Sequence, residues 1–306
     1  MRNQFILSLC ELAKINKNII LIVGDLGYSV VEPFSRQFPD RFINAGVAEQ
    51  NMMGMAAGMA SEGYHVFVYS IANFPTFRCA EQIRNDVDYH NLHVTIVSVG
   101  AGLSYGNLGY SHHAIQDLAL MRSMPNTLIA TPIDPLEVKS CLEYLVRNPG
   151  PSYLRLGKTG EKNHRNVQPL LDIGKICEIV PSKNKKIILV ISRTIEIGKK
   201  LLDEKEFFEF GLFSIPLWSS KSKVEFMTSI NQFKEVIFIE DHLEDGGFCS
   251  WAREALAQSS IAIKFFSFSL SSNIIGKVGN EQDLFDISGM TVKNIIFEYR
   301  KKSAQN

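Results

Sequence analysis

Residues 43–60 read INAGVAEQNMMGMAAGMA, a glycine turn and one early carboxylate followed by small and apolar residues. Gly46 suits a tight turn. Residues 52–60 contain only Met, Gly and Ala, which predicts a helix buried on all sides. Glu49 falls in its first turn, where free N–H groups favour a negative charge. We therefore expect Glu49 in a poorly solvated position, with a proton to share with a ligand nitrogen; the alternative is that Glu49 only caps its own helix.

Length and composition indicate an ordinary globular chain of two domains. The 306 residues include 32 basic and 32 acidic side chains and are 45% hydrophobic, so charge gives no support to nucleic-acid binding. No apolar run approaches the roughly 20 residues that span a bilayer, and the first residues lack a signal-peptide pattern. We expect no membrane segment and a cytoplasmic location. The five scattered cysteines contain no CxxC pair, which indicates neither a disulfide framework nor a zinc site.

The first half of the chain alternates strands and helices. The apolar run at residues 19–23 predicts a buried strand that ends just before Asp25. Further strands are expected at 66–71, 94–99 and 127–131, and helices at 4–14, 76–87, 115–121 and 135–146. This alternation predicts a mainly parallel sheet with helices on both faces. Ligands of such sheets bind beyond the carboxyl ends of the strands, which would place Asp25, Glu49, residues 70–77 and the loop 100–113 around one crevice.

A second α/β unit follows a polar passage that starts at Gly157. Its expected strands are 187–191, 236–239 and 261–266, with a glycine turn at 246–247 and a helix at 250–257. The predicted fold class is therefore α/β, with two doubly wound, mainly parallel-sheet domains. We expect the first domain at 1–156, a linker at 157–185 and the second domain at 186–306.

The usual phosphate-binding motifs are missing from the sequence. There is no GxGxxG after a predicted strand, no GxxxxGK[ST], and no GDG followed by Asn about 30 residues later. A phosphorylated cofactor would therefore need another source of phosphate and metal ligands.

Several spaced motifs occur in a fixed order: GVAEQ at 46–50, YSIANFPTF at 69–77, EQIRNDV at 81–87, a glycine loop ending in His112 and His113, and QDLALMRSMPN at 116–126. This series resembles the pyrimidine-binding half of transketolases, and IEDHLEDGGF at 239–248 resembles the start of the family's C-terminal domain. The resemblance implies a pyrimidine-binding domain plus a transketolase C-terminal domain, and thiamine diphosphate as cofactor. Full-length members carry a further domain for the diphosphate and metal. The resemblance therefore implies a separate N-terminal-half subunit that holds the diphosphate and Mg²⁺ (or Ca²⁺), in an α2β2 heterotetramer.

The resemblance assigns the cofactor residues. Glu49 matches the Glu whose hydrogen bond to N1′ of the pyrimidine promotes the tautomer that removes the thiazolium C2 proton. Phe74 and Phe77 match the rings that stack on the pyrimidine, and the third aromatic position is Ile71. On base rates alone, both Phe side chains would be assigned to core packing.

The resemblance also assigns substrate residues. Asp25 matches the acid near the thiazolium, although a loop-capping Asp is an equal alternative. Ser29, Arg155 and Arg2 fall where transketolases bind the distal phosphate of a sugar phosphate, a role that suits the planar fork of Arg. An isolated surface Arg is the alternative, above all for Arg2.

The glycine loop both matches the family and departs from it. His112 matches the active-site His after the GEDGP loop and could bind substrate hydroxyls or move protons; the alternative is a helix-capping His. Leu108 replaces the Asp of that loop, and Gly100 replaces a second substrate His. Loss of two polar contacts indicates an unusual donor or acceptor, because sites that bind hydroxyls discriminate strongly on that basis.

The predicted function is the pyrimidine-binding subunit of a split transketolase that moves a two-carbon ketol unit from a ketose to an aldehyde. Glu49 would activate the cofactor, while His112 and Asp25 handle protons and hydroxyls. One alternative is a thiamine-dependent synthase or acyl transferase that uses pyruvate or another 2-oxo acid, with which Leu108 is compatible. Another is a non-catalytic regulatory partner.

Overall fold

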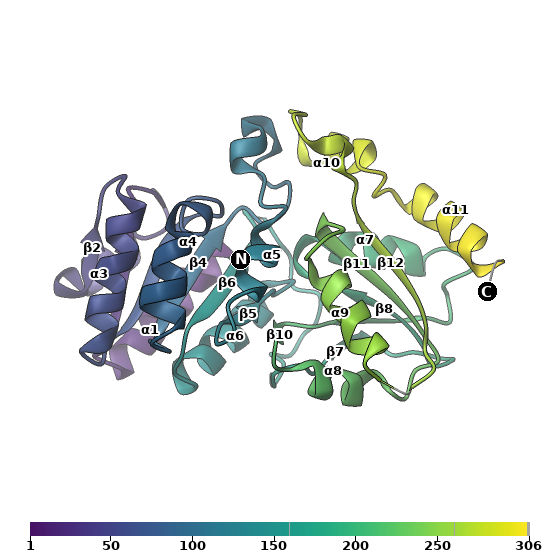
Figure 1. The fold of residues 1–306 in the computed structure, drawn as a ribbon, viewed down its shortest axis with the longest axis horizontal. Helices are drawn as coiled ribbons and strands as arrows, with labels where there is room; N and C mark the ends of the chain where they lie inside the picture. Colours follow the sequence, from purple (N-terminus) through teal and green to yellow (C-terminus); the bar gives the residue numbers. More distant parts are fainter. Residues whose placement is uncertain (159, 260, 305–306) are drawn as a thin grey trace.

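The computed structural model describes residues 1–158, 160–259 and 261–304, so that position 159 of the expected linker and positions 260 and 305–306 of the expected second domain lie outside it. The chain forms two sheets that lie next to each other, each covered by helices (Figure 1). A seven-stranded sheet has the order β10-β5-β6-β4-β3-β1-β2, and a five-stranded sheet has the order β12-β11-β8-β9-β7. Most neighbouring strands are parallel, which confirms the predicted fold class.

The strands of the first sheet come mainly from the first half of the chain. They are β1 (Ile19–Val23), β2 (Phe42–Asn44), β3 (His65–Ile71), β4 (Val94–Val99), β5 (Leu128–Ala130), β6 (Ser152–Leu156) and β10 (Leu217–Trp218). The last of these pairs antiparallel with β5 at the edge of the sheet. The expected second domain therefore contributes a strand to the first sheet.

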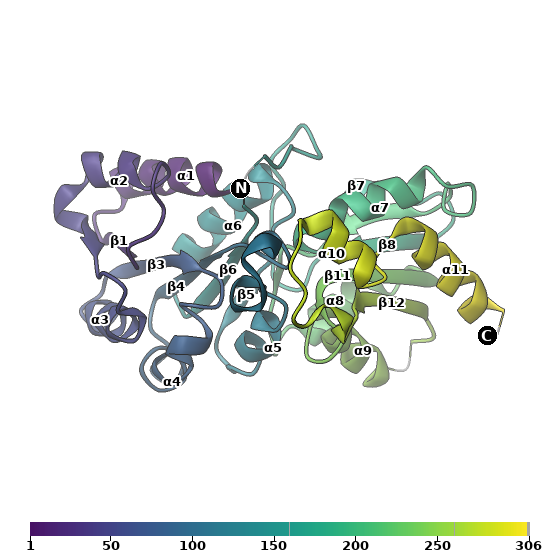
Figure 2. The same cartoon turned by 90° about the horizontal axis from the view of Figure 1, so that it is seen from above.

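Helices cover both faces of this sheet (Figure 2). One face carries α1 (Arg2–Ile15), α2 (Glu32–Gln37) and α6 (Pro135–Arg147), and the other carries α3 (Glu49–Ser61), α4 (Ala80–Gln82) and α5 (Asp117–Arg122). Side chains of β1 alternate between the two cores, since Leu21 packs in the core with α1 and Ile22 in the core with α3. A strand buried on both faces explains the continuous apolar run at 19–23.

The second sheet contains β7 (Cys177–Val180), β8 (Lys186–Val190), β9 (Gly211–Ser214), β11 (Glu235–Leu243) and β12 (Lys264–Leu270). Its helices are α7 (Ile195–Leu202), α8 (Lys223–Ile230), α9 (Phe248–Ala257), α10 (Glu281–Ile287) and α11 (Val292–Ser303). β7 lies inside the expected linker and pairs antiparallel with β9. The expected linker therefore supplies a strand, and the boundaries 1–156, 157–185 and 186–306 stay a prediction.

Two local expectations differ from the structure. The helix expected at 76–87 is a 3-10 turn (Phe77–Cys79), a short α4 and a π-helical stretch (Ile83–Asp88). The helix expected to be buried on all sides, α3, buries Met52 and Ala56 but leaves open space beside Gly54 and Gly58. Within this chain, only one side of α3 is therefore buried, although its residues 52–60 are apolar all round.

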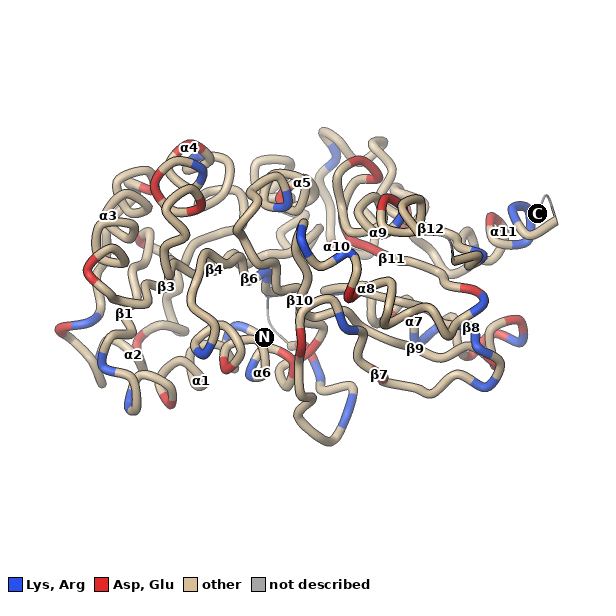
Figure 3. The backbone as a smooth tube through the Cα atoms, turned by 60° about the horizontal axis from the view of Figure 1, so that its bottom comes forward, with Lys and Arg blue, Asp and Glu red and all other residues tan. Residues whose placement is uncertain are grey.

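Charged residues of both signs are interspersed along both units (Figure 3). None of the helices in the described parts of the chain combines the length and the apolar character needed to cross a membrane.

Candidate active site

The carboxyl ends of β1 to β4 bring the predicted crevice residues to one edge of the first sheet. β1 pairs in parallel with β2 and β3, and β3 pairs in parallel with β4. Asp25 follows β1, Glu49 begins α3 soon after β2, Ile71 ends β3, and Gly100 follows β4. Parallel pairing therefore gathers these four positions on the same side of the sheet.

Glu49 lies at the first residue of α3 and is 5% exposed. Its Oε1 accepts a hydrogen bond of 3.0 Å from Nη1 of Arg78. The same guanidinium lies over the ring of Phe74, with Cζ 4.1 Å from the ring centroid, while 48% of the Arg78 side chain is exposed. One planar cation thus contacts both the carboxylate and the aromatic ring.

His112 packs edge-on against the same ring. The His112 and Phe74 ring centroids are 5.3 Å apart, and the hydroxyl of Ser111 is 2.9 Å from Nδ1 of His112. Burial, followed by the neighbouring His113 and Arg78, lowers the pKa of His112 below its ordinary value. The imidazole is therefore neutral at neutral pH and can both donate and accept a hydrogen bond.

Asn73 ties the loop that carries His112 to the end of β3. Its side-chain amide donates to the carbonyl oxygens of Ser111 (3.0 Å) and His113 (2.9 Å). These two bonds fix the position of His112 relative to Phe74. Glu49, Phe74 and His112 are thus three predicted site residues that the structure brings together.

Asp25 and Ser29 make hydrogen bonds that stabilise the loop after β1. Asp25 has a positive φ of 54°, and its Oδ1 accepts from the amide of Asn44 (3.0 Å) and the hydroxyl of Tyr28 (3.1 Å). The backbone N–H of Ser29 donates to Oε1 of Glu32 at 2.7 Å. Asp25 is therefore a loop-stabilising residue in this structure, and its role near a cofactor stays a prediction, as does the phosphate role of Ser29.

A pocket of about 210 Å³ opens at the same strand ends, and Arg2, Ser70, Ile71 and Tyr105 are among its lining residues. Nε of Arg2 and Oγ of Ser70 are buried and have no hydrogen-bond partner among the described residues. Buried polar atoms without partners are costly, so this pocket suits a polar or anionic ligand group. The structure brings Arg2 and Ile71 to one pocket.

Tyr105 occupies the space that a larger residue at position 100 would need. A Cβ added to Gly100 would collide with the Tyr105 ring, and Gly100 has a φ of +99°. Only a residue without a side chain fits at position 100 beside this ring, and the expected replacement of a substrate His by Gly100 stays a prediction. Leu108, expected to replace an Asp, is 49% exposed, and Phe77 is 48% exposed.

Arg155 is not available to a substrate. Its side chain is fully buried, and it donates to Asp117 (Nε to Oδ2, 2.7 Å), Asp241 (Nη1 to Oδ1, 2.5 Å) and Ser192 (3.0 Å). Burial opposes its charge, but Asp117 and Asp241 outweigh this effect and raise the pKa of Arg155 above its ordinary value. The expectation that Arg155 binds a phosphate is wrong, because this guanidinium joins β6 to α5 and β11.

Sequence reasoning missed Arg78, Asn73 and Tyr105. Arg78 directly follows Phe77, so its position beside a predicted cofactor ring was a usable signal. The roles of Asn73 and Tyr105 depend on the path of the loop at 100–113, which no local pattern reveals. Within residues 1–158, 160–259 and 261–304, no three His, Cys, Asp or Glu side chains are grouped so that they could hold a metal ion.

Comparison with known proteins identifies the family. The family model described as transketolase, pyrimidine binding domain, matches residues 1–160. The chain belongs to the transketolase family. It is similar to a "Putative transketolase C-terminal section" from Methanocaldococcus jannaschii, with 30% identity over 99% of this chain and 96% of the relative. It is also similar to one of the subunits of an apulose-4-phosphate transketolase from Phocaeicola vulgatus, with 27% identity over 96% and 94% of the two chains.

A solved structure titled "Split gene transketolase, inactive beta4 tetramer" superposes with a TM-score of 0.83 and 26% identity, over 98% of this chain and 96% of the other. A "1-deoxy-D-xylulose-5-phosphate synthase" from Desulfotalea psychrophila is 29% identical over 94% of this chain, which spans 46% of that relative. These matches confirm that the chain is a C-terminal section of the split transketolase type. Family membership implies thiamine diphosphate as cofactor.

The residues at the strand ends fit the pyrimidine of that cofactor. Glu49 is a nearly buried carboxylate whose Oε1 accepts a hydrogen bond from Arg78. Arg78 supplies a flat group of hydrogen-bond donors that stacks on Phe74 and binds Glu49. An aminopyrimidine has the same combination of a flat face and edge hydrogen-bonding groups.

Proposed function

We propose that this chain is the pyrimidine-binding subunit of a two-chain thiamine diphosphate enzyme that transfers a two-carbon ketol unit from a ketose donor to an aldehyde acceptor. The contact of Arg78 with both Glu49 and Phe74 is the observation that supports this most directly. In the chain alone, Arg78 takes the place proposed for the pyrimidine. Arg78 then leaves this place when the cofactor binds, and its half-exposed side chain allows that movement.

Glu49 has the role of holding a proton at the pyrimidine N1′. Its carboxylate is desolvated on one side by α3 and lies at the helix N-terminus, so a hydrogen bond to a ring nitrogen is stronger there than in water. When bound, thiamine diphosphate supplies the electron sink for cleavage of the bond beside a carbonyl. Phe74 and Phe77 would support the ring, with Ile71 giving a less specific apolar contact.

His112 has the role of a proton donor and acceptor to substrate hydroxyls. Its lowered pKa keeps it neutral, and Asn73 fixes its loop. Asp25 would meet the cofactor from the loop after β1. Arg2 and Ser29 would bind an anionic end of the substrate, in the case of Arg2 through the nitrogen left without a partner in its pocket.

The partner chain would supply the diphosphate and metal ligands. The described residues offer no metal cluster of their own, and the sequence has no GDG motif. We propose that the partner is a chain of the transketolase N-terminal-half type that holds Mg²⁺, in an α2β2 assembly. The domain boundaries 1–156, 157–185 and 186–306 belong to the same proposal.

Calorimetric titration tests this proposal. Thiamine diphosphate with Mg²⁺ is titrated into the chain alone, into the chain mixed with a partner that carries the GDG motif, and into the same mixture with Glu49→Gln. Binding in the first mixture, with ketose-dependent turnover that Glu49→Gln reduces at least about 100-fold, supports the proposal. No binding in any mixture contradicts it, and turnover unaffected by Glu49→Gln would favour a non-catalytic role for this chain.

The second candidate is a synthase or acyl transferase that takes its unit from a 2-oxo acid. The replacement of the family Asp by the exposed Leu108 favours it, because an apolar side chain gives no hydrogen bond to a ketose hydroxyl. The similarity to a 1-deoxy-D-xylulose-5-phosphate synthase agrees with this candidate. Turnover with pyruvate and none with ketose phosphates would select it.

A further inference from the structure

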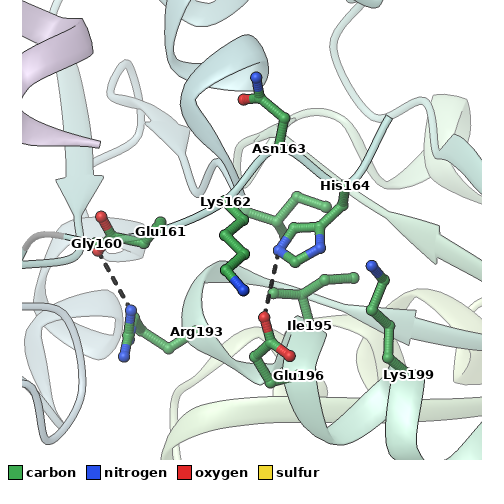
Figure 4. A pocket seen from close by; sticks show the side chains of 10 residues that line it. Gly160, Glu161, Lys162, Asn163, His164, Arg193, Ile195, Glu196 and Lys199 are labelled. Atoms are coloured by element: carbon green, nitrogen blue, oxygen red, sulfur yellow. Dashed lines mark hydrogen bonds and ion pairs between the residues drawn. The ribbon is translucent and has the colours of Figure 1, made fainter. Parts of the chain in front are cut away.

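A second, larger pocket shares no lining residue with the pocket at the strand ends (Figure 4). Its volume is about 520 Å³, within the roughly 300–1,000 Å³ range of small-molecule sites. Its lining comes from three places: Ile133 before α6, residues 160–164 after β6, and residues 193–199 at the start of α7. We call it the α7 pocket. It is bordered by segments from both sheets.

Two lysines of the lining form no ion pair with another lining residue. Lys162 and Lys199 extend into the α7 pocket from different segments, and no ion pair joins either to another residue of the lining (Figure 4). Arg193, by contrast, is neutralised, because it pairs with Glu281 (Nη2 to Oε2, 2.6 Å) and with Glu161 (Nη1 to Oε1, 3.3 Å). Glu196 also lines the α7 pocket, so the three cations and two carboxylates of the lining leave a net positive charge of one.

His164 adds an unused hydrogen-bonding group. Its side chain is only 4% exposed, and its Nδ1 is buried without a hydrogen-bond partner among the described residues. Its Nε2 is 3.7 Å from Oε1 of Glu196, whose side chain is 62% exposed. A buried imidazole nitrogen without a partner is unfavourable, so a ligand or an ordered water near His164 would lower the free energy of the pocket.

The start of α7 borders the same space, because Ile195 and Glu196 of its first turn line the pocket. A 3-10 turn (Ser192–Thr194) runs directly into α7, so Ile195 does not begin an open helix N-terminus. The positive charge that favours an anion in this pocket therefore comes from Lys162 and Lys199.

We propose that the α7 pocket binds a doubly charged phosphate group, free or as the ester of a small metabolite, between Lys162 and Lys199. Glu196 has a largely exposed side chain and can turn away to admit the anion. The pocket has room for more than a phosphate group alone, which favours an ester. Because the lining comes from the segment after β6 and from α7, such a ligand would hold these two parts of the chain together.

Calorimetric titration of the full chain, without thiamine diphosphate or partner, tests this site independently of the proposed activity. Inorganic phosphate and glycerol 3-phosphate serve as probes, at constant ionic strength. We expect saturable binding that Lys162→Ala and Lys199→Ala each weaken at least fivefold. Lys200→Ala is the matched control, because Lys200 is the next residue of α7, is exposed and does not line the pocket, and it should change binding less than twofold.

The two probes distinguish the source of the phosphate. Tighter binding of glycerol 3-phosphate indicates an ester, and tighter binding of phosphate indicates the free ion; both support the site. Absence of saturable binding would overturn the proposal. So would binding that both lysine variants leave unchanged, and Arg2→Ala then shows whether the anion sits at the strand ends instead.

Discussion

Replacement of Arg155 with Met should destabilise the whole chain. The guanidinium is fully buried and its removal leaves Asp117 and Asp241 as buried carboxylates without their cation. Breaking a buried ion pair in this way costs about 3–5 kcal/mol. With an unfolding entropy of roughly 2.1 cal/mol/K per residue over 306 residues, the melting temperature should fall by about 5–8 °C.

The assay is thermal unfolding of the purified chain, followed by circular dichroism or scanning calorimetry. Arg147→Met is the matched control, because Arg147 is exposed at the end of α6 and bonds only the carbonyl oxygen of Glu143 in the described structure. We expect the control to change the unfolding free energy by less than about 0.5 kcal/mol. A melting temperature of Arg155→Met within about 1 °C of that control would be well below the expected shift. Together with a raised KM for a phosphorylated sugar, it would refute the structural role of Arg155.

Arg78→Met should bind thiamine diphosphate more tightly in the two-chain mixture, because it removes the group that occupies Glu49 and Phe74. A half-exposed ion pair and a cation–π contact together contribute about 1 kcal/mol, so the Kd should fall about fivefold. A higher Kd for the variant would show that Arg78 supports cofactor binding instead. Stability should also depend on pH, since burial raises the pKa of Glu137 and Glu240 to about 7. Both carboxyl groups therefore hold their proton to a higher pH in the folded chain than in the unfolded chain, so the unfolding free energy should fall as pH rises from about 4.5 to about 7. Urea unfolding of Glu240→Gln should show a shallower decline over this range, and an unchanged slope would contradict the raised pKa.

Apolar runs made the central strands predictable. The strands at 19–23 and 94–99 have the expected bounds, because both are buried on both faces: the first is entirely apolar and the second is apolar except for Thr95 and Ser98. The edge strand β10 has two residues and β2 has three. Strands this short carry no period that a sequence pattern can reveal.

Arg155 shows where a resemblance is a poor guide to a side chain. Its position on β6 is fixed by the alternation of the strand, but its partner Asp241 is 86 residues away in the sequence. A motif indicates that an Arg is present, whereas only the approach of Asp117 on α5 and Asp241 on β11 determines that this Arg is enclosed. The burial of Glu49 was predictable for the opposite reason, because α3, the helix that buries this side chain, begins at Glu49 itself.

The contacts of Arg78 bear on why the proposed enzyme would need a partner chain. In the single chain, Glu49 is nearly buried and its charge is balanced by Arg78, so an empty site carries no unpaired buried carboxylate. A pyrimidine that replaces Arg78 must offset the lost ion pair and the lost stacking before it gains anything. A partner that binds the diphosphate supplies that free energy from a different part of the same cofactor. In the proposed split of the site between two chains, Arg78 balances the charge of Glu49 while the site is empty, and the proposed partner contributes the free energy that lets the pyrimidine replace Arg78.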